Sequence, residues 1–203
     1  MSRSQLPTVV TDTGVIAVLR GLDPHRVEVV AGVLRRSGIT VLEVTMDSPD
    51  ATSSIERNVG EGAVVGAGTV MSVADAEAAI SAGAEFLVSP HTDLEVVRWA
   101  GERDIPIVPG AFTPTEVSVA WNAGAAAVKI FPASVGGPGL LKAIRGPFGE
   151  LPLIPTGGIT ASNAGAFLAA GAIAVGVGGW LTDHEDLGVV GERAAAIVAA
   201  TSR

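Results

Sequence analysis

Short runs of apolar residues recur along the chain and are separated by longer segments that mix polar and apolar positions. The centres of these runs lie roughly 20 to 25 residues apart, the length of one strand and one crossover helix. Eight such runs occur, at residues 15–20, 40–44, 63–68, 85–90, 105–110, 126–132, 152–158 and 173–179. The pattern therefore predicts eight strands, each followed by a helix.

Capping residues followed by proline mark where several of these helices are expected to begin. Three such pairs occur: Asp23-Pro24, Ser48-Pro49 and Thr113-Pro114. Glu116 completes a capping box with Thr113, and Ser72 with Asp75 offers a further helix start.

A second repeat lies over the first. The residues Ala-Gly-Ala occur at 82–84, 123–125 and 170–172, directly before the fourth, sixth and eighth predicted strands. This alternation favours an α/β fold of the closed (β/α)8 TIM barrel type over an open sheet. A doubly wound sheet is the alternative, but neither GAGTVM nor GVGGWL completes a G-x-G-x-x-G motif. No linker interrupts the pattern, so we expect residues 1–203 to form a single barrel domain.

Composition and charge exclude some classes of site and partner. The chain has 203 residues, a formal net charge of −8 and no cysteine, which excludes thiolate metal sites and gives no basic surface for nucleic acid. No signal-peptide pattern begins the chain, so a cytoplasmic location is expected. Residues 164–181 carry no charge and approach the minimum length of a membrane span, but their five glycines and their division into a helix and a strand argue against membrane association.

In a barrel of this type, function is expected at the carboxyl ends of the strands. A polar and glycine-rich set occupies those positions: Arg20, Glu43, Thr45, Thr69, Pro90, His91, Lys129, Phe131, Thr156, Gly157, Gly158, Gly178 and Gly179. We therefore expect a polar ring at one end of an apolar tube.

Lys129 is one of only two lysines and lies inside the apolar run AAVKIFP. Burial disfavours an ammonium group, so such a lysine is expected to offer a free amine that attacks a ketone and forms an iminium. Glu43 lies between Leu42 and Val44, where a carboxylate is costly without a partner or a function. If both side chains point inward, Glu43 can move protons for the amine. A snorkelling lysine or a structural Lys–Glu ion pair is the alternative.

The other strand ends indicate binding. Gly157 and Gly158 precede a helix capped by Thr160, after the seventh strand, where barrels often bind phosphate, and Gly178-Gly179 follows the eighth strand. Arg20 is a candidate to hold a substrate carboxylate. His91 is the only histidine among these strand ends, and no second histidine lies at metal-ligand spacing from it. We therefore expect neither a metal nor a cofactor.

Taken in order, several motifs resemble those of the 2-keto-3-deoxy-6-phosphogluconate aldolase / 4-hydroxy-2-oxoglutarate aldolase family. They are VIAVLRG, LEVTM, VGAGTV, SPH, PGAFTPTE, VKIFPA, PTGGIT and GVGGWL. The resemblance runs nearly end to end. It implies a class I aldolase of the Entner–Doudoroff type that uses no metal, acts on a small 2-keto acid and assembles as a homotrimer.

The resemblance also implies roles for individual residues. Lys129 matches the Schiff-base lysine, Glu43 the general acid/base, and Arg20 an arginine that many members have at the end of the first strand. The remaining matches are pocket residues and phosphate-binding backbone: Thr69, Pro90, Phe131, Thr156, Gly157 and Gly158. The implied reaction is reversible cleavage of 2-keto-3-deoxy-6-phosphogluconate to pyruvate and glyceraldehyde 3-phosphate.

Two positions depart from the family pattern. Asp47 stands where some members have an arginine, and Gly179 stands where many have a serine that binds phosphate. Cleavage of 4-hydroxy-2-oxoglutarate or of the galactonate epimer by the same chemistry therefore stays open. So does a phosphate-binding barrel without lyase activity, in which Glu43 and Lys129 would form a closed ion pair.

Overall fold

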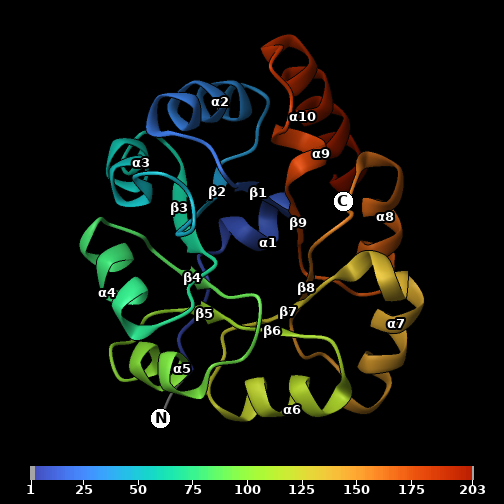
Figure 1. Cartoon of the computed structure of the whole chain (residues 1–203). Coiled ribbons are helices and arrows are strands. Elements are labelled where there is room, and N and C mark those ends of the chain that lie inside the picture. Colours follow the sequence, from blue (N-terminus) through green and yellow to red (C-terminus); the bar gives the residue numbers. More distant parts are fainter. Residues whose placement is uncertain (1–2, 203) are drawn as a thin grey trace.

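The computed structural model describes residues 3–202 and has parallel strands at its centre with helices around them (Figure 1). The strands are β1 (Val15–Leu19), β2 (Val41–Thr45), β3 (Val64–Gly68), β4 (Leu87–Val88), β5 (Ile107–Val108), β6 (Gly110–Ala111), β7 (Val128–Ile130), β8 (Leu153–Pro155) and β9 (Val175–Val177). The helices are α1 (Val9–Thr13), α2 (Pro24–Arg36), α3 (Ala51–Asn58), α4 (Val73–Ser81), α5 (Leu94–Gly101), α6 (Pro114–Asn122), α7 (Ala133–Phe148), α8 (Ala161–Ala169), α9 (Gly179–Thr182) and α10 (Leu187–Thr201). The eight predicted strand regions are all present, the fifth as two short strands.

The strands form a curled sheet in two parts. One part has the order β5-β4-β3-β2-β1-β9 and the other β6-β7-β8, with every pairing parallel. Pro109 separates β5 from β6, and its carbonyl accepts a 2.9 Å hydrogen bond from the Lys129 N–H. On the other side, a parallel bridge joins Thr156 to Gly176. The α/β class predicted from the sequence is thus confirmed, and the parallel strands lie in a curled sheet.

Alternate residues of each strand point to opposite sides of the sheet. One set packs against the outer helices. The other set forms a separate inner cluster, called here the apolar layer: Val10, Ile16, Val41, Phe86, Val88, Val108, Ala127, Ile154 and Ala174. Val10 belongs to α1, so this short helix packs against the inner side chains of the strands. The apolar layer fills the centre of the fold and leaves the carboxyl ends of the strands for other residues.

Most of the predicted helix starts are confirmed. The Asp23 carboxylate accepts a hydrogen bond from the Arg26 N–H at the start of α2, and Ser72 accepts one from the Asp75 N–H at the start of α4. The Thr113–Glu116 capping box opens α6.

The Ser48-Pro49 prediction is wrong. Helix α3 begins at Ala51 after Asp50, whose side chain makes no capping hydrogen bond. The Ser48 hydroxyl instead accepts a 2.8 Å hydrogen bond from the Gly21 N–H, in the loop after β1. The Ser48 hydroxyl thus bonds to a residue distant in sequence and does not cap the helix.

The apolar segment at 164–181 is divided among α8, β9 and α9. Within residues 3–202, no helix has both the length and the apolar character needed to cross a bilayer.

Candidate active site

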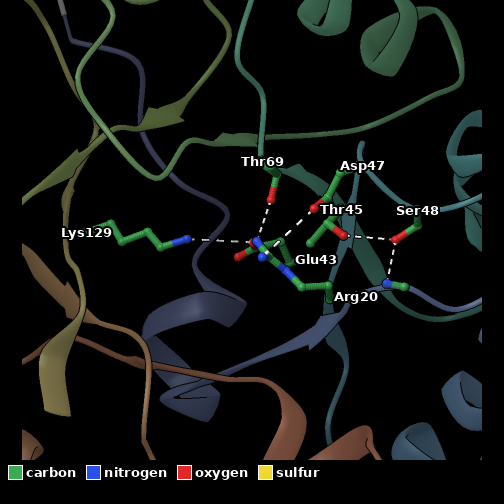
Figure 2. Close-up of polar contacts among 8 residues, drawn as sticks. Arg20, Glu43, Thr45, Asp47, Ser48, Thr69 and Lys129 are labelled. Carbon is green, nitrogen blue, oxygen red and sulfur yellow. Dashed lines mark hydrogen bonds and ion pairs between the residues drawn. The ribbon is translucent and has the colours of Figure 1, made fainter.

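Lys129 and Glu43 face each other inside the curled sheet (Figure 2). Lys129 Nζ lies 4.0 Å from Glu43 Oε1, and the two residues are only 4% and 2% exposed. Their strand neighbours on both sides point outward into the helix-facing core. The period of two that buries those apolar neighbours is therefore also what turns the lysine and the glutamate inward.

This ion pair is not closed. A separation of 4.0 Å exceeds hydrogen-bond length, and Glu43 Oε1 is a buried oxygen without a hydrogen-bond partner among residues 3–202. A buried, unsatisfied carboxylate oxygen is costly unless something else fills its acceptor position. The closed structural pair considered as the alternative for these two residues does not match this geometry.

Glycine makes the space that Glu43 occupies. A Cβ atom on Gly68, in the neighbouring strand β3, would collide with the Glu43 carboxylate. Two residues earlier, a Cβ on Gly66 would collide with the ring of Phe86. In VVGAG, Gly66 thus leaves room for the Phe86 ring, and Gly68 leaves room for the Glu43 carboxylate.

Lys129 opens onto a cavity of about 250 Å³. Eleven of the strand-end residues were predicted to be catalytic or substrate-binding, which leaves out Thr45 and His91. Eight of the eleven line this cavity: Arg20, Lys129, Phe131, Thr156, Gly157, Gly158, Gly178 and Gly179. The Phe131 ring lies beside the amine, with its centroid 5.2 Å from Lys129 Nζ. Four segments far apart in sequence therefore line one hollow, with the Lys129 amine at its buried end.

Arg20 and Thr69 form a second polar group at the mouth of this site (Figure 2). Arg20 donates a 2.7 Å hydrogen bond to the Thr69 hydroxyl, and its guanidinium lies 3.9 Å from the Asp47 carboxylate. The Arg20 and Asp47 side chains are both about half exposed, so this ion pair is screened by solvent. The Arg20 guanidinium has further N–H donors besides the one that contacts Thr69.

The loop that carries Arg20 is fixed by buried hydroxyls. Thr45 and Ser48 hydrogen bond to each other over 2.9 Å, and Ser48 also accepts from the Gly21 N–H (Figure 2). Thr45, a predicted ring residue, thus supports the site through its neighbours.

The glycine turn after β8 is held from two sides. Gly157 and Gly158 both have positive φ, at 93° and 74°, a region that favours glycine. The Asn163 amide donates to the Gly158 carbonyl, and the Ser134 N–H donates to the Gly157 carbonyl. A Cβ on Gly158 would also press on the Ser134 side chain. The turn is therefore rigid where it lines the cavity.

Pro90 lies apart from the other predicted residues. It lines a neighbouring hollow of about 400 Å³ together with His91 and Gly110. Phe131 forms part of the lining of both hollows. Thus the structure places Pro90 behind Phe131 rather than in the cavity beside Lys129.

Four lining residues were not predicted: Val18, Ile159, Trp180 and Asp183. Val18 has a sequence signal, because it alternates with the outward residues of β1. Asp183 lies in the acidic run DHEDL, which gives no signal of a position in a cavity. Among residues 3–202, no group of three or more histidine, aspartate or glutamate side chains is arranged to hold a metal ion.

Chemically, the arrangement offers an amine, a carboxylate and a bounded cavity. A buried amine next to a proton-transfer group can form and hydrolyse an iminium with a ketone. The cavity beside it leaves space for such a ketone.

Comparisons with known proteins agree with this chemistry. The family model for KDPG and KHG aldolase matches residues 7–194. A probable 2-dehydro-3-deoxy-6-phosphogalactonate aldolase of Rhizobium meliloti (strain 1021) is 38% identical over 205 residues, covering 98% of this chain and 96% of that protein.

Two solved structures extend the comparison. The KDPG aldolase of Legionella pneumophila, with pyruvate captured as a covalent carbinolamine intermediate, has a TM-score of 0.81 and 30% identity over 96% of this chain and 95% of that chain. A protein cage designed by fusing symmetric oligomeric domains has a TM-score of 0.87 and 32% identity over 92% of this chain and 71% of that chain. Because the family model matches residues 7–194 and the Rhizobium relative is 38% identical over nearly the whole chain, this chain belongs to the KDPG and KHG aldolase family, whose members are lyases.

Proposed function

We propose that this chain is a class I aldolase that cleaves a 2-keto-3-deoxy sugar acid to pyruvate and an aldehyde through a Schiff base on Lys129. The single observation that carries the proposal is the open pair of Lys129 Nζ and Glu43 Oε1, 4.0 Å apart and buried beside the cavity.

In the proposed reaction, Lys129 passes an ammonium proton to the Glu43 carboxylate, and the free amine attacks the C2 ketone. A proton then moves from the nitrogen to the new alkoxide, which gives a carbinolamine. Glu43 donates a proton to the departing hydroxyl, so that water leaves and an iminium forms. The Glu43 carboxylate then accepts the C4 hydroxyl proton as the C3–C4 bond breaks. The electron pair of that bond passes into the iminium and gives an enamine, while C4 leaves as an aldehyde. Protonation of the enamine at C3 and hydrolysis return pyruvate and the free amine.

The cavity supports this orientation of the substrate. Lys129 lies at its buried end, so the keto carbon binds there and the rest of the chain extends toward the exposed rim. Phe131 and Thr156 border the keto end, and Arg20 supplies a cation for the C1 carboxylate. Gly157, Gly158, Gly178 and Gly179 border the tail of the substrate.

For the substrate itself, we propose 2-keto-3-deoxy-6-phosphogluconate, with pyruvate and glyceraldehyde 3-phosphate as products. The galactonate epimer is the second candidate, because the Rhizobium relative that is 38% identical carries that name. Cleavage of 4-hydroxy-2-oxoglutarate would follow the same steps with glyoxylate as the aldehyde product.

We further propose that the two parts of the sheet constitute one closed (β/α)8 barrel and that the whole chain forms one catalytic domain. The Pro109 interruption and the Thr156–Gly176 bridge support closure. A cytoplasmic homotrimer is the proposed working form, in line with the resemblance to the family.

Pyruvate release from each keto acid tests the function directly. The Lys129→Ala variant is expected to release pyruvate at least about 10³-fold more slowly, because the covalent route is removed. Lys142→Ala is the matched control, since Lys142 is the only other lysine and is exposed on α7. Full activity in a folded Lys129→Ala protein would overturn the proposal.

A further inference from the structure

The outer end of the cavity carries an acidic side chain. Asp183 follows α9 and lines the cavity together with Gly179. Its Oδ2 lies 2.5 Å from the position that a Cβ on Gly179 would take. The carboxylate therefore covers the glycine backbone where a serine side chain would otherwise project.

This carboxylate lines a second hollow together with Arg26, but the two form no ion pair. None of the ion pairs within residues 3–202 includes Asp183, and its contact with a side chain is a 3.5 Å hydrogen bond from the Thr182 hydroxyl. The two cations that line the cavity have other positions. Lys129 lies at the buried end, and Arg20 is bonded to Thr69 and lies near Asp47.

The tail of a bound keto acid would meet this carboxylate. With C2 bonded to Lys129, the carbons beyond C4 extend past the glycine turn toward the exposed rim formed by Gly158, Gly179 and Asp183. A terminal phosphate carries a charge of nearly −2 at neutral pH and is repelled by an aspartate at close range. A terminal hydroxyl instead donates a hydrogen bond to a carboxylate.

We propose that Asp183 is a specificity-determining residue that weakens the preference of this aldolase for a 6-phosphate, so that it also cleaves the unphosphorylated 2-keto-3-deoxy sugar acid, whose tail ends in a hydroxyl. The inference rests on the proposed aldolase function and specifies its substrate class. Gly179 stands where many family members have a phosphate-binding serine, and the Asp183 carboxylate occupies the space of that side chain.

The test compares kcat/KM for 2-keto-3-deoxygluconate and for its 6-phosphate. In the unaltered protein, kcat/KM for the 6-phosphate is expected to exceed that for the unphosphorylated acid by less than about 10-fold. Asp183→Asn should raise kcat/KM for the 6-phosphate about 10-fold, because a partly screened charge repulsion is removed, while kcat/KM for the unphosphorylated acid stays equal or falls. Glu185→Gln is the control: it removes the same charge from the same loop, but Glu185 does not line this cavity.

Ionic strength adds a second readout. Added salt should raise kcat/KM for the 6-phosphate in the unaltered protein and have a smaller effect in Asp183→Asn. A preference of 10-fold or more for the 6-phosphate, unchanged by Asp183→Asn, would overturn the inference and leave the aldolase proposal intact. Absence of pyruvate from every keto acid would instead remove the proposed function itself.

Discussion

The same strands build two levels inside the curled sheet. One is the apolar layer, and the other, two residues further along the strands, is a polar level that contains Glu43, Lys129 and Thr156. Strand β2 places Val41 in the apolar layer and Glu43 beside the cavity, and the β7 segment places Ala127 and Lys129 in the same way. Near β8, the pair is Ile154 and Thr156. In these three strand segments, a step of two residues exchanges an apolar side chain for a polar one on the same face.

This comparison separates stability from chemistry. The apolar layer is continuous, buried and supported by α1, so substitutions there should act on the free energy of unfolding. The polar level contains a carboxylate oxygen without a partner and borders a cavity, so substitutions there should act on the reaction. Such a division is expected of barrels, whose strand ends at one side carry function.

After the loss of Lys129 itself, the largest effect on the reaction is expected from Glu43→Gln. The amide keeps the shape of the side chain but cannot take up or release the proton, so kcat for pyruvate release should fall by about 10² to 10⁴-fold. Circular dichroism should show a folded protein. A variant with near-normal kcat would show that another group carries the protons.

Phe86→Ala should give the converse result in the apolar layer. Removing a buried aromatic ring costs about 3 to 5 kcal/mol of the free energy of unfolding. Urea denaturation measures this loss, and Phe86→Leu should recover much of it. If the comparison of the two levels is correct, the folded fraction still forms a pyruvate adduct. Loss of the adduct in folded Phe86→Ala protein would show that the two levels are coupled.

Gly68→Ala tests the boundary between the levels. The new methyl group would collide with the Glu43 carboxylate and displace it from Lys129. A displacement of about 1 Å can reduce a catalysed rate about 10²-fold, so kcat should fall by up to that factor. Gly101→Ala is the matched control, because a Cβ there meets no other atom. Equal rates for the two variants would contradict the role given to Gly68.

The smallest effect is expected outside both levels, at Glu116 on α6. Hydrogen bonds from the N–H groups of Phe112 and Thr113 lower the pKa of this carboxyl below its ordinary value of 4.5. The charged form therefore stabilises the folded state above that pH, and the contribution is lost as the pH falls below it. Glu116→Gln should lower the melting temperature slightly at pH 7 and less at pH 4, with kcat unchanged. A larger loss at acidic pH would contradict the sign of this linkage.

Much of the fold could be predicted because its signals are local. The eight apolar runs, the Asp23 and Thr113 caps and the inward alternation of Glu43 and Lys129 all depend on residues close in sequence. The meeting of Glu43 and Lys129 then follows from the curled parallel sheet.

What could not be predicted depends on tertiary neighbours. Ser48 bonds to Gly21 rather than capping a helix, and Pro90 lies behind Phe131. Asp183 looks like a solvated loop residue until the chain after β9 brings it over Gly179. These placements arise from contacts between segments that no short pattern encodes.

Borohydride trapping tests the central claim most directly. The protein is incubated with excess pyruvate, reduced and digested, and the adduct is located by peptide mass spectrometry. We predict a reduced pyruvate adduct on Lys129, none on Lys142, and loss of the adduct in Lys129→Ala. Folded protein that shows no adduct, or carries it on Lys142, would contradict the assignment of Lys129 as the Schiff-base nucleophile.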